Sequence, residues 1–367
     1  MGDSPLVSFR VEEEACCESH YTNICVLQGI FQMLGCNLPI HGAKRELTVL
    51  MLVVIFFLII ATESLEAFNH GHAQSSNINS DSGRKPNRFV ILNFDDSHRS
   101  QIDYAKPILD KYGFKATFFH VCGWIGNNDW QQIAKLRQEG MDLQAHTVEH
   151  PDLNKVSKEA LEREVAGSKQ CFHDRGFNTT IFAYPFGVGS HNSTIVDQVA
   201  QSYDLARASE REPLAFLHCD VIDQVDCRTY GENGKLNREN KYSINSWSHN
   251  HIEGPWSYDT QSCMDSTCRY YNNDQMFDRF VNAVNSQDEY NSDGTVRAIP
   301  IIVYHSFAPF SDVSDSKVPV DTSVNLFERE MKYLHDNGFQ VLTMANLGYD
   351  ESKNQLYVKN ITHPVLR

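Results

Sequence analysis

The stretch Phe89-Val90-Ile91-Leu92-Asn93-Phe94-Asp95-Asp96 sets the pattern that the rest of the chain follows. Its apolar run predicts a buried strand over residues 89–94. Two adjacent carboxylates then stand at the carboxyl end of that strand, where like charges resist joint ionisation. A bound cation is the usual compensation, so this stretch predicts a strand that ends in a metal site.

Downstream of this strand, short apolar runs alternate with longer segments of helical periodicity. Strands are predicted at 116–121, 142–145, 181–184, 205–208, 298–304 and 340–343, and helices at 102–112, 130–139, 158–175, 193–201, 275–285 and 324–337. This alternation predicts a mostly parallel sheet with helical crossovers. Its extent over residues 88–347 favours an α/β fold, a distorted TIM-like (β/α) barrel of about seven parallel strands. A doubly wound open sheet is the alternative, although no GxGxxG follows the first strand.

The alternation is interrupted between about 209 and 273, a polar stretch that contains four cysteines. We expect a Cys-containing insertion over one face of the barrel rather than a separate domain, because long loops in compact folds usually have a functional or disulfide-held reason. Within it, His249 and His251 are expected to belong to a solvated loop.

Composition bounds the possible functions. The chain has 367 residues, of which 41% are hydrophobic, so it can bury a sizeable core in one large domain or two ordinary ones. Its net charge of -15 argues against a broad nucleic-acid interface, which requires clustered Lys and Arg.

Residues 47–61 read LTVLMLVVIFFLIIA and follow Lys44 and Arg45. This run is short for a spanning helix, which needs about 20 apolar residues, but it fits the core of a signal peptide. We therefore predict a signal peptide or membrane anchor at 47–73, preceded by an N-terminal tail at 1–46 that an internal start would remove. A linker at 74–87 and a C-terminal tail at 348–367 flank the barrel. Both readings of the apolar segment predict an extracellular or cell-surface protein, secreted or anchored by 47–61.

The cysteines agree with export. The six that follow the apolar segment are Cys122, Cys171, Cys219, Cys227, Cys263 and Cys268. An even number suits disulfides in an oxidising compartment, and Cys219/Cys227 and Cys263/Cys268 are plausible local pairs. Sequons at Asn178, Asn192 and Asn360 predict a glycoprotein.

The candidate functional residues follow predicted strands. Asp95 and Asp96 follow the first strand, His146 follows the strand at 142–145, and His305 follows the strand at 298–304. The segment 184–187 ends another strand. Because the carboxyl ends of parallel strands open onto one face of a barrel, where active sites lie, we expect these residues to lie together.

His146 and His150 are spaced four residues apart, so both imidazoles can bind one ion. Pro151 disfavours the helical region for His150, which predicts a loop. Two histidines and one carboxylate leave coordination positions open, the pattern of catalytic rather than structural zinc. The sequence thus predicts a divalent metal ion as cofactor, with Zn²⁺ as the expected ion.

With these motifs in place, residues 88–347 resemble the NodB-like polysaccharide deacetylase family, carbohydrate esterase family four. The family's motifs T-F-D-D-G, H-[ST]-x-x-H, R-x-P-[YF]-G and a strand ending in His correspond to 93–97, 146–150, 183–187 and 302–305. The second motif combined with Phe-Asp-Asp is specific, whereas the others are weak alone.

The resemblance implies a role for each residue at the site. It implies that Asp96, His146 and His150 bind the metal. Asp95 would be the general base that takes a proton from the metal-bound water, and His305 would be the general acid that protonates the leaving amine.

Further roles concern the substrate. The resemblance implies that the backbone N–H of Phe186 helps to bind the oxyanion. Tyr184, Pro185 and Trp247 are predicted to contact the substrate, with Trp247 as a groove wall.

One departure from the family concerns the charge next to the base. Ala183 stands where the third motif has an Arg. Arg207, in the strand that follows, could supply the missing charge beside Asp95. A surface arginine is the alternative interpretation.

The sequence therefore predicts an exported metal-dependent deacetylase, a hydrolase of amide bonds that removes N-acetyl or O-acetyl groups from a glycan. A small-molecule amidohydrolase on the same barrel is one alternative, and a catalytically silent carbohydrate-binding surface protein is another. The expected partner is an acetylated glycan, with no nucleic acid, and with membrane contact only through 47–61 if that segment is uncleaved.

Overall fold

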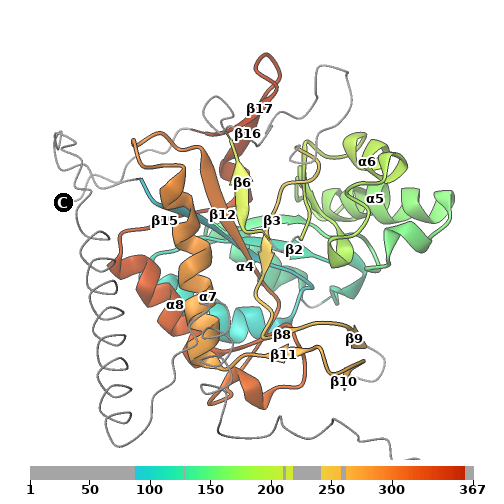
Figure 1. The fold of residues 1–367 in the computed structure, drawn as a ribbon. Coiled ribbons are helices and arrows are strands. Elements are labelled where there is room, and N and C mark those ends of the chain that lie inside the picture. The colour runs from blue at the N-terminus through green and yellow to red at the C-terminus, as the bar shows by residue number, and fades with distance from the viewer. Residues whose placement is uncertain (1–86, 128, 210–211, 218–240, 258–261, 360–367) are drawn as a thin grey trace, which may run out of the picture. The chain divides into compact units, whose positions relative to one another are not determined.

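The computed structural model describes residues 87–127, 129–209, 212–217, 241–257 and 262–359 (Figure 1). The predicted tail at 1–46, the apolar segment at 47–61, Cys219, Cys227 and the sequon at Asn360 lie outside these residues. Within the described ranges, no helix is both long enough and apolar enough to cross a membrane.

A mostly parallel, curled sheet forms the centre of the fold. Its parallel strands are β1 (Phe89–Phe94), β2 (Thr117–His120), β3 (Asp142–Ala145), β4 (Ile181–Ala183), β5 (Leu205–Arg207) and β12 (Ala298–Tyr304), which lie in the order β5-β4-β3-β2-β1-β12. β15 (Gln340–Leu342) pairs in parallel with the first half of β1. This arrangement confirms the predicted α/β class and parallel sheet.

β1 is buried on both faces, which explains its uninterrupted apolar run. Val90, Leu92 and Phe94 pack into the cluster beneath the helices, whereas Phe89 and Ile91 belong to a second cluster. That second cluster includes residues of β2, β4, β5 and β12, so it fills the space that the curled sheet encloses.

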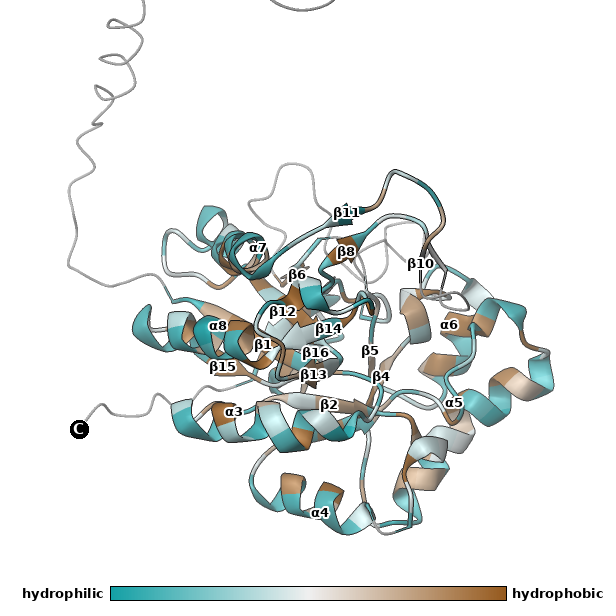
Figure 2. Cartoon of the chain, turned by 90° about the horizontal axis from the view of Figure 1, so that it is seen from below, coloured by the Kyte–Doolittle hydropathy of each residue, from teal (hydrophilic) through white to brown (hydrophobic). Residues whose placement is uncertain are grey.

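Helices cover the outside of the sheet (Figures 1 and 2). They are α3 (Lys106–Tyr112), α4 (Trp130–Gln138), α5 (Lys158–His173), α6 (Ser193–Ala200), α7 (Asn273–Asn285) and α8 (Val324–Asp336). A π-helical turn, Gln101–Ala105, precedes α3. Gly113 ends α3 in the left-handed conformation, φ 70°, as the Gly after the apolar pattern had indicated.

Part of the predicted insertion belongs to the sheet itself. The amide of Ile244 donates to the carbonyl of Ala206 at 3.0 Å, and β7 (Trp247–Ser248) pairs in parallel with β12. Residues 241–248 thus join β5 to β12, the two ends of the parallel order. β6 (Leu214–Phe216) also pairs with β12, in antiparallel register. β6 and β7 are only three and two residues long, and the segment 241–248 is rich in Ser and Asn, so the sequence pattern gave no strand signal there.

The remainder of this region forms small antiparallel pairs. β8 (Ile252–Glu253) pairs with β11 (Arg269–Tyr270), and β9 (Trp256–Ser257) pairs with β10 (Ser262–Cys263). The predicted Cys263–Cys268 disulfide is confirmed. A second disulfide, Cys122–Cys171, ties the turn after β2 to α5.

Two further pairs lie outside the main sheet. β13 (Ser306–Ala308) and β14 (Asp321–Ser323) pair in parallel after β12. β16 (Leu347–Asp350) and β17 (Gln355–Val358) form an antiparallel hairpin. The second pair occupies most of the segment predicted as a C-terminal tail.

The expectation that His249 and His251 lie in a solvated loop was wrong, because both side chains are fully buried. His249 Nε2 lies 2.8 Å from Glu330 Oε1, and Tyr304 donates to the other oxygen of Glu330 at 2.7 Å. A buried carboxylate on α8 thus supplies the polar partner that makes burial of His249 tolerable.

Candidate active site

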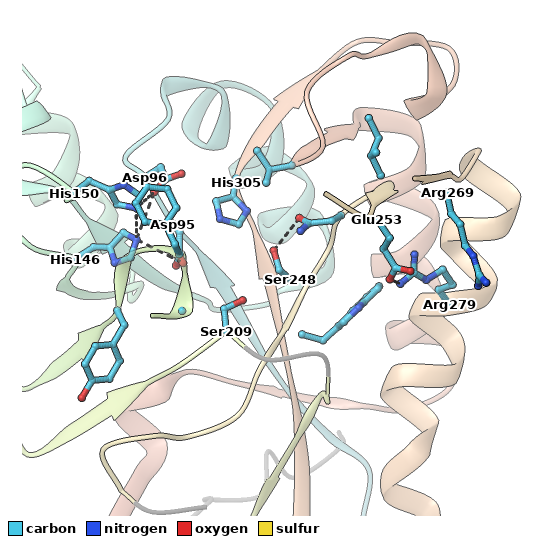
Figure 3. A pocket seen from close by; sticks show the side chains of 18 of the residues that line it. Asp95, Asp96, His146, His150, Ser209, Ser248, Glu253, Arg269, Arg279 and His305 are labelled. Carbon is cyan, nitrogen blue, oxygen red and sulfur yellow. Dashed lines mark hydrogen bonds and ion pairs between the residues drawn. The ribbon is translucent and has the colours of Figure 1, made fainter. Parts of the chain in front are cut away.

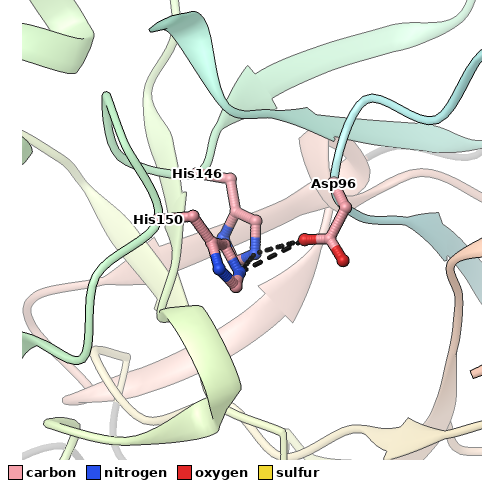
Figure 4. Close-up of side chains that lie close together, drawn as sticks. All are labelled: Asp96, His146 and His150. Carbon is pink, nitrogen blue, oxygen red and sulfur yellow. Dashed lines mark hydrogen bonds and ion pairs between the residues drawn. The ribbon is translucent and has the colours of Figure 1, made fainter. Parts of the chain in front are cut away.

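Asp96, His146 and His150 converge at the carboxyl ends of β1 and β3 (Figure 4). Asp96 Oδ1 lies 3.2 Å from His150 Nε2 and 3.5 Å from His146 Nε2. The two Nε2 atoms lie 3.1 Å apart. Two ligand atoms bound about 2.0–2.1 Å from one tetrahedral ion are about 3.3 Å apart. The cluster therefore has the dimensions of a metal site.

The chemistry of these donors also fits a divalent cation. His146 Nδ1 lies 2.8 Å from the carbonyl oxygen of Ala183, which places the proton on Nδ1 and leaves the Nε2 lone pair facing the cluster. Asp96 Oδ1 is buried and accepts no hydrogen bond from any described residue. Burial alone would raise the pKa of Asp96, but the adjacent imidazoles of His146 and His150 hold it well below its ordinary range. Asp96 is therefore an ionised carboxylate at neutral pH.

The loop that carries the two histidines is held in a strained conformation. Thr147 and His150 both have positive φ angles, 66° and 61°, which cost of order 1–3 kcal/mol each in residues with a side chain. Thr147 Oγ1 accepts the His150 amide at 2.9 Å. Buried Glu164 of α5 accepts the amides of Val148 and Glu149 at 3.0 and 2.8 Å. These contacts fix the loop so that both imidazoles face Asp96.

Asp95 forms a buried ion pair with Arg207. Arg207 Nη2 donates to Asp95 Oδ2 at 2.5 Å, and the side chains are 0% and 5% exposed. The guanidinium also lies over the Phe119 ring, 4.9 Å from its centroid. The hypothesis that Arg207 supplies the charge missing at Ala183 is thus confirmed, and the alternative of a surface arginine is excluded. Asp95 Oδ1 accepts no hydrogen bond from a described residue.

His305 lines the same cavity beyond Asp95 (Figure 3). Gln101 donates to the carbonyl oxygens of His305, at 2.9 Å, and of Asp95, at 2.5 Å, so it ties the ends of β12 and β1 together. Burial lowers the pKa of His305, and the carboxylates of Asp96 and Asp95 oppose this shift. Asp95 and His305 are therefore titratable side chains near the cluster that do not belong to it, as is His98, whose Nε2 lies 3.7 Å from Asp96 Oδ2.

The predicted substrate residues take different positions. Phe186 lines the cavity with its side chain half exposed, and its ring lies 4.5 Å from that of His150. Its φ of 57° turns the backbone sharply after β4. Trp247 also lines the cavity. Pro185 is buried in the turn before Phe186, and Tyr184 lines the cavity while its ring packs against Phe182 in the core.

The cavity itself measures about 910 Å³. Sequence reasoning missed several of its lining residues, which come from the irregular region between β5 and α7: Ser209, Ser248, Asn250, Glu253, Arg269 and Arg279 (Figure 3). The closely spaced Cys263 and Cys268 were the only signal in the sequence that this region holds a fixed shape.

Comparisons with known proteins agree with the motifs. Residues 82–207 match the family model of polysaccharide deacetylases. The chain is 36% identical over 110 residues to "Putative polysaccharide deacetylase YxkH" of Bacillus subtilis, covering 28% of this chain and 39% of that protein. It is 27% identical over 124 residues to the poly-β-1,6-N-acetyl-D-glucosamine N-deacetylase of Staphylococcus epidermidis, covering 29% and 43% of the two chains. The matches thus span well under half the length of these relatives.

Among solved structures, the deacetylase PplD of Streptococcus pyogenes in complex with acetate is 29% identical, with a TM-score of 0.35, over 43% of this chain and 63% of that chain. The three metal-site residues and Asp95 all lie within the segment matched by the family model, at the strand ends where its motifs predicted them. Residues 82–207 of the chain are thus similar to the polysaccharide deacetylase family.

Proposed function

We propose that this protein is an exported, metal-dependent deacetylase that hydrolyses N-acetyl or O-acetyl groups of a glycan. The observation that carries the proposal is the position of Asp95, which lies beside the metal cluster without belonging to it. Its Oδ2 is paired with Arg207, while Oδ1 has no hydrogen-bond partner among the described residues. Binding of a glycan alone would require neither this carboxylate nor its buried ion pair.

Asp96, His146 and His150 would hold the metal, and we expect Zn²⁺ because two histidines and one carboxylate are typical of its catalytic sites. When bound, such an ion activates a water molecule as a nucleophile and polarises the acyl oxygen. Asp95 accepts the proton of the attacking water at Oδ1. Arg207 keeps the carboxylate in place and compensates its charge in the dry interior.

His305 would deliver the proton that the leaving amine or alcohol requires. It lines the cavity together with Asp95 and Asp96, and its position is fixed through the contact of Gln101 with its carbonyl oxygen. The backbone N–H of Phe186 would donate to the oxyanion that forms at the acyl carbon. The left-handed backbone at Phe186 is the kind of strained position that functional sites often contain.

The substrate would lie along the cavity, with Trp247 as one wall. The relative from Staphylococcus epidermidis is named for N-deacetylation of a poly-N-acetylglucosamine, which supports an acetylated polysaccharide as the substrate class. The apolar segment at 47–61 would export the protein, by cleavage or as an anchor, because its length and composition fit the core of a signal peptide. Within this reading the sequon residues and the disulfides belong to an oxidising compartment.

Acetate release tests this proposal. The purified full chain is assayed on a panel of N- and O-acetylated oligosaccharides and on small cyclic amides, with and without a chelator. We expect chelator-sensitive release from glycans. We also expect that Asp95→Asn keeps the metal but loses the activity, whereas His146→Ala loses the metal.

Three other outcomes of these assays would each contradict part of the proposal. Undiminished release by Asp95→Asn would contradict the role of the base. Turnover of cyclic amides alone would favour the small-molecule amidohydrolase. Glycan binding without turnover by the metal-loaded protein would favour a silent binding protein.

A further inference from the structure

The cavity extends from the metal cluster to a wall that the family motifs do not supply. This wall consists of Glu253 on β8, Arg269 on β11 and Arg279 on α7, which lie across the cavity from His146 and His150 in Figure 3. The strands that carry it come from the region between β5 and α7, outside the segment that matches the deacetylase family. Its charges are therefore a property of this chain rather than of the shared catalytic site.

Two of the three charges compensate each other. Glu253 forms an ion pair with Arg279 and accepts the hydroxyl of Tyr271 at 2.9 Å. The guanidinium of Arg279 also lies over the rings of Tyr271 and Trp247, at 4.1 and 5.5 Å. These contacts occupy the Glu253 carboxylate and fix Arg279 in place, so this pair adds no net charge to the cavity.

Arg269 is the cation that remains. It stands directly opposite Glu253 in the antiparallel β8–β11 pair, yet it forms no ion pair with Glu253 or with any other described residue. Its side chain is exposed and lines the cavity. The neighbouring Cys263–Cys268 disulfide and the β8 pairing hold its backbone. An arginine with no ion-pair partner among the described residues thus lines the cavity of a chain whose net charge is -15.

We propose that Arg269 binds an anionic group of the glycan, on a sugar other than the one whose acetyl group reaches the metal. A guanidinium offers a planar fork of N–H donors that matches a carboxylate, phosphate or sulfate. The cavity that Arg269 lines also contains Glu253, Asn250 and Ser248, whose polar side chains can accept or donate hydrogen bonds to sugar hydroxyls. This inference rests on the proposed function, because it assigns the substrate class of the same site: an acetylated glycan that carries acidic groups.

The test uses oligosaccharides that differ only in charge. The first is an oligosaccharide of alternating N-acetylglucosamine and glucuronic acid, and the second is its carboxyl-reduced, neutral form. A third, neutral in its sugars but O-sulfated, distinguishes an ester anion from a carboxylate. Equilibrium binding by calorimetry and acetate release are both measured for the full chain, for Arg269→Gln, and for Arg163→Gln, an exposed arginine of α5 that does not line the cavity.

We expect the wild type to bind at least one anionic form several-fold more tightly than the neutral form. Arg269→Gln should abolish this preference and leave binding of the neutral form unchanged, while Arg163→Gln retains the preference. Equal binding of all forms by the wild type, or an equal loss for all forms in Arg269→Gln, would overturn the inference. Charge-dependent binding without acetate release would uphold this inference while contradicting the proposed activity, so the two failures are distinguishable.

Discussion

Arg207 and Asp95 form an ion pair of 2.5 Å in which the arginine is completely buried. The two residues come from β5 and from the end of β1, and they are joined across the interior that the curled sheet encloses. In the family motif the arginine stands one strand earlier than β5, at the position that Ala183 of β4 occupies here. In this chain the guanidinium reaches the same carboxylate from the next strand, since Ala183 and Arg207 are paired in the β4–β5 register.

We expect Arg207→Met to destabilise the protein by about 3–5 kcal/mol, because it leaves Asp95 as an uncompensated charge in the interior. It should also abolish most of the acetate release. The double variant Arg207→Met/Asp95→Asn should recover much of the lost free energy of unfolding without recovering activity. Denaturant unfolding of the wild type, Arg207→Met, Asp95→Asn and the double variant measures the coupling free energy between the two side chains. Additive losses in the double variant would contradict a direct pair.

Glu164 is predicted to set the affinity of the metal site without touching the ion. Its carboxylate accepts the amides of Val148 and Glu149, and these contacts hold the strained loop that carries both histidines. We expect Glu164→Gln to weaken metal binding by about 10–100-fold, the usual effect of losing a supporting contact. The measurement is a metal titration of the purified protein by calorimetry.

The matched control is Glu162→Gln, an exposed residue of the same helix. It should leave the metal affinity unchanged. A decrease in thermal stability of Glu164→Gln with full metal affinity would show that Glu164 supports only the fold.

Most of the fold was predictable because its strands are buried on both faces. β1 and β12 have the bounds that were predicted for them. Strands that are buried on both faces of a parallel sheet have continuous apolar sequences, such as 89–92 and 298–304, and this pattern identifies them. The segment 241–248 was not predictable, because Ser243, Asn245 and Ser246 carry no apolar pattern. Those residues are buried by the strands on either side rather than by their own hydrophobicity.

The candidate site, like the fold, could be predicted from the sequence only in part. Residues next to strong strands, such as Asp96 and His146, were found from their position at strand ends. Arg269 and Glu253 were missed because they lie on strands of two residues each, whose pairing depends on contacts distant in sequence. No local pattern in the sequence could have placed them at the cavity.

The two disulfides are predicted to contribute unequally to stability. Cys122–Cys171 closes a loop with a sequence separation of 49, whereas the separation for Cys263–Cys268 is 5. Loop-closure entropy then predicts a loss of about 4 kcal/mol for Cys122→Ser/Cys171→Ser and about 2 kcal/mol for Cys263→Ser/Cys268→Ser. Denaturant unfolding under non-reducing conditions measures both values.

The same variants separate stability from binding at the cavity wall. Cys263→Ser/Cys268→Ser should weaken the binding of anionic oligosaccharides, because the disulfide is adjacent to Arg269. Cys122→Ser/Cys171→Ser should leave that preference intact in the folded protein. The reverse pattern would show that the wall does not depend on its disulfide.

His120 is predicted to make the fold sensitive to acid. Burial, together with the nearby His146, lowers its pKa from 6.5 to about 4, and its Nδ1 lies 3.1 Å from Ser97 Oγ. Between these two pKa values the unfolded chain binds a proton that the folded protein does not. The unfolded state therefore gains stability as the pH falls through this window, by roughly 3 kcal/mol in total.

We expect His120→Gln to remove this contribution, so that its free energy of unfolding falls less steeply than that of the wild type between pH 6.5 and 4. His173→Gln serves as the control, because His173 has a side chain that is 78% exposed. Urea unfolding at a series of pH values, with the metal removed from all samples, gives the difference between the slopes. Parallel curves for the wild type and His120→Gln would show that another buried group carries the acid sensitivity.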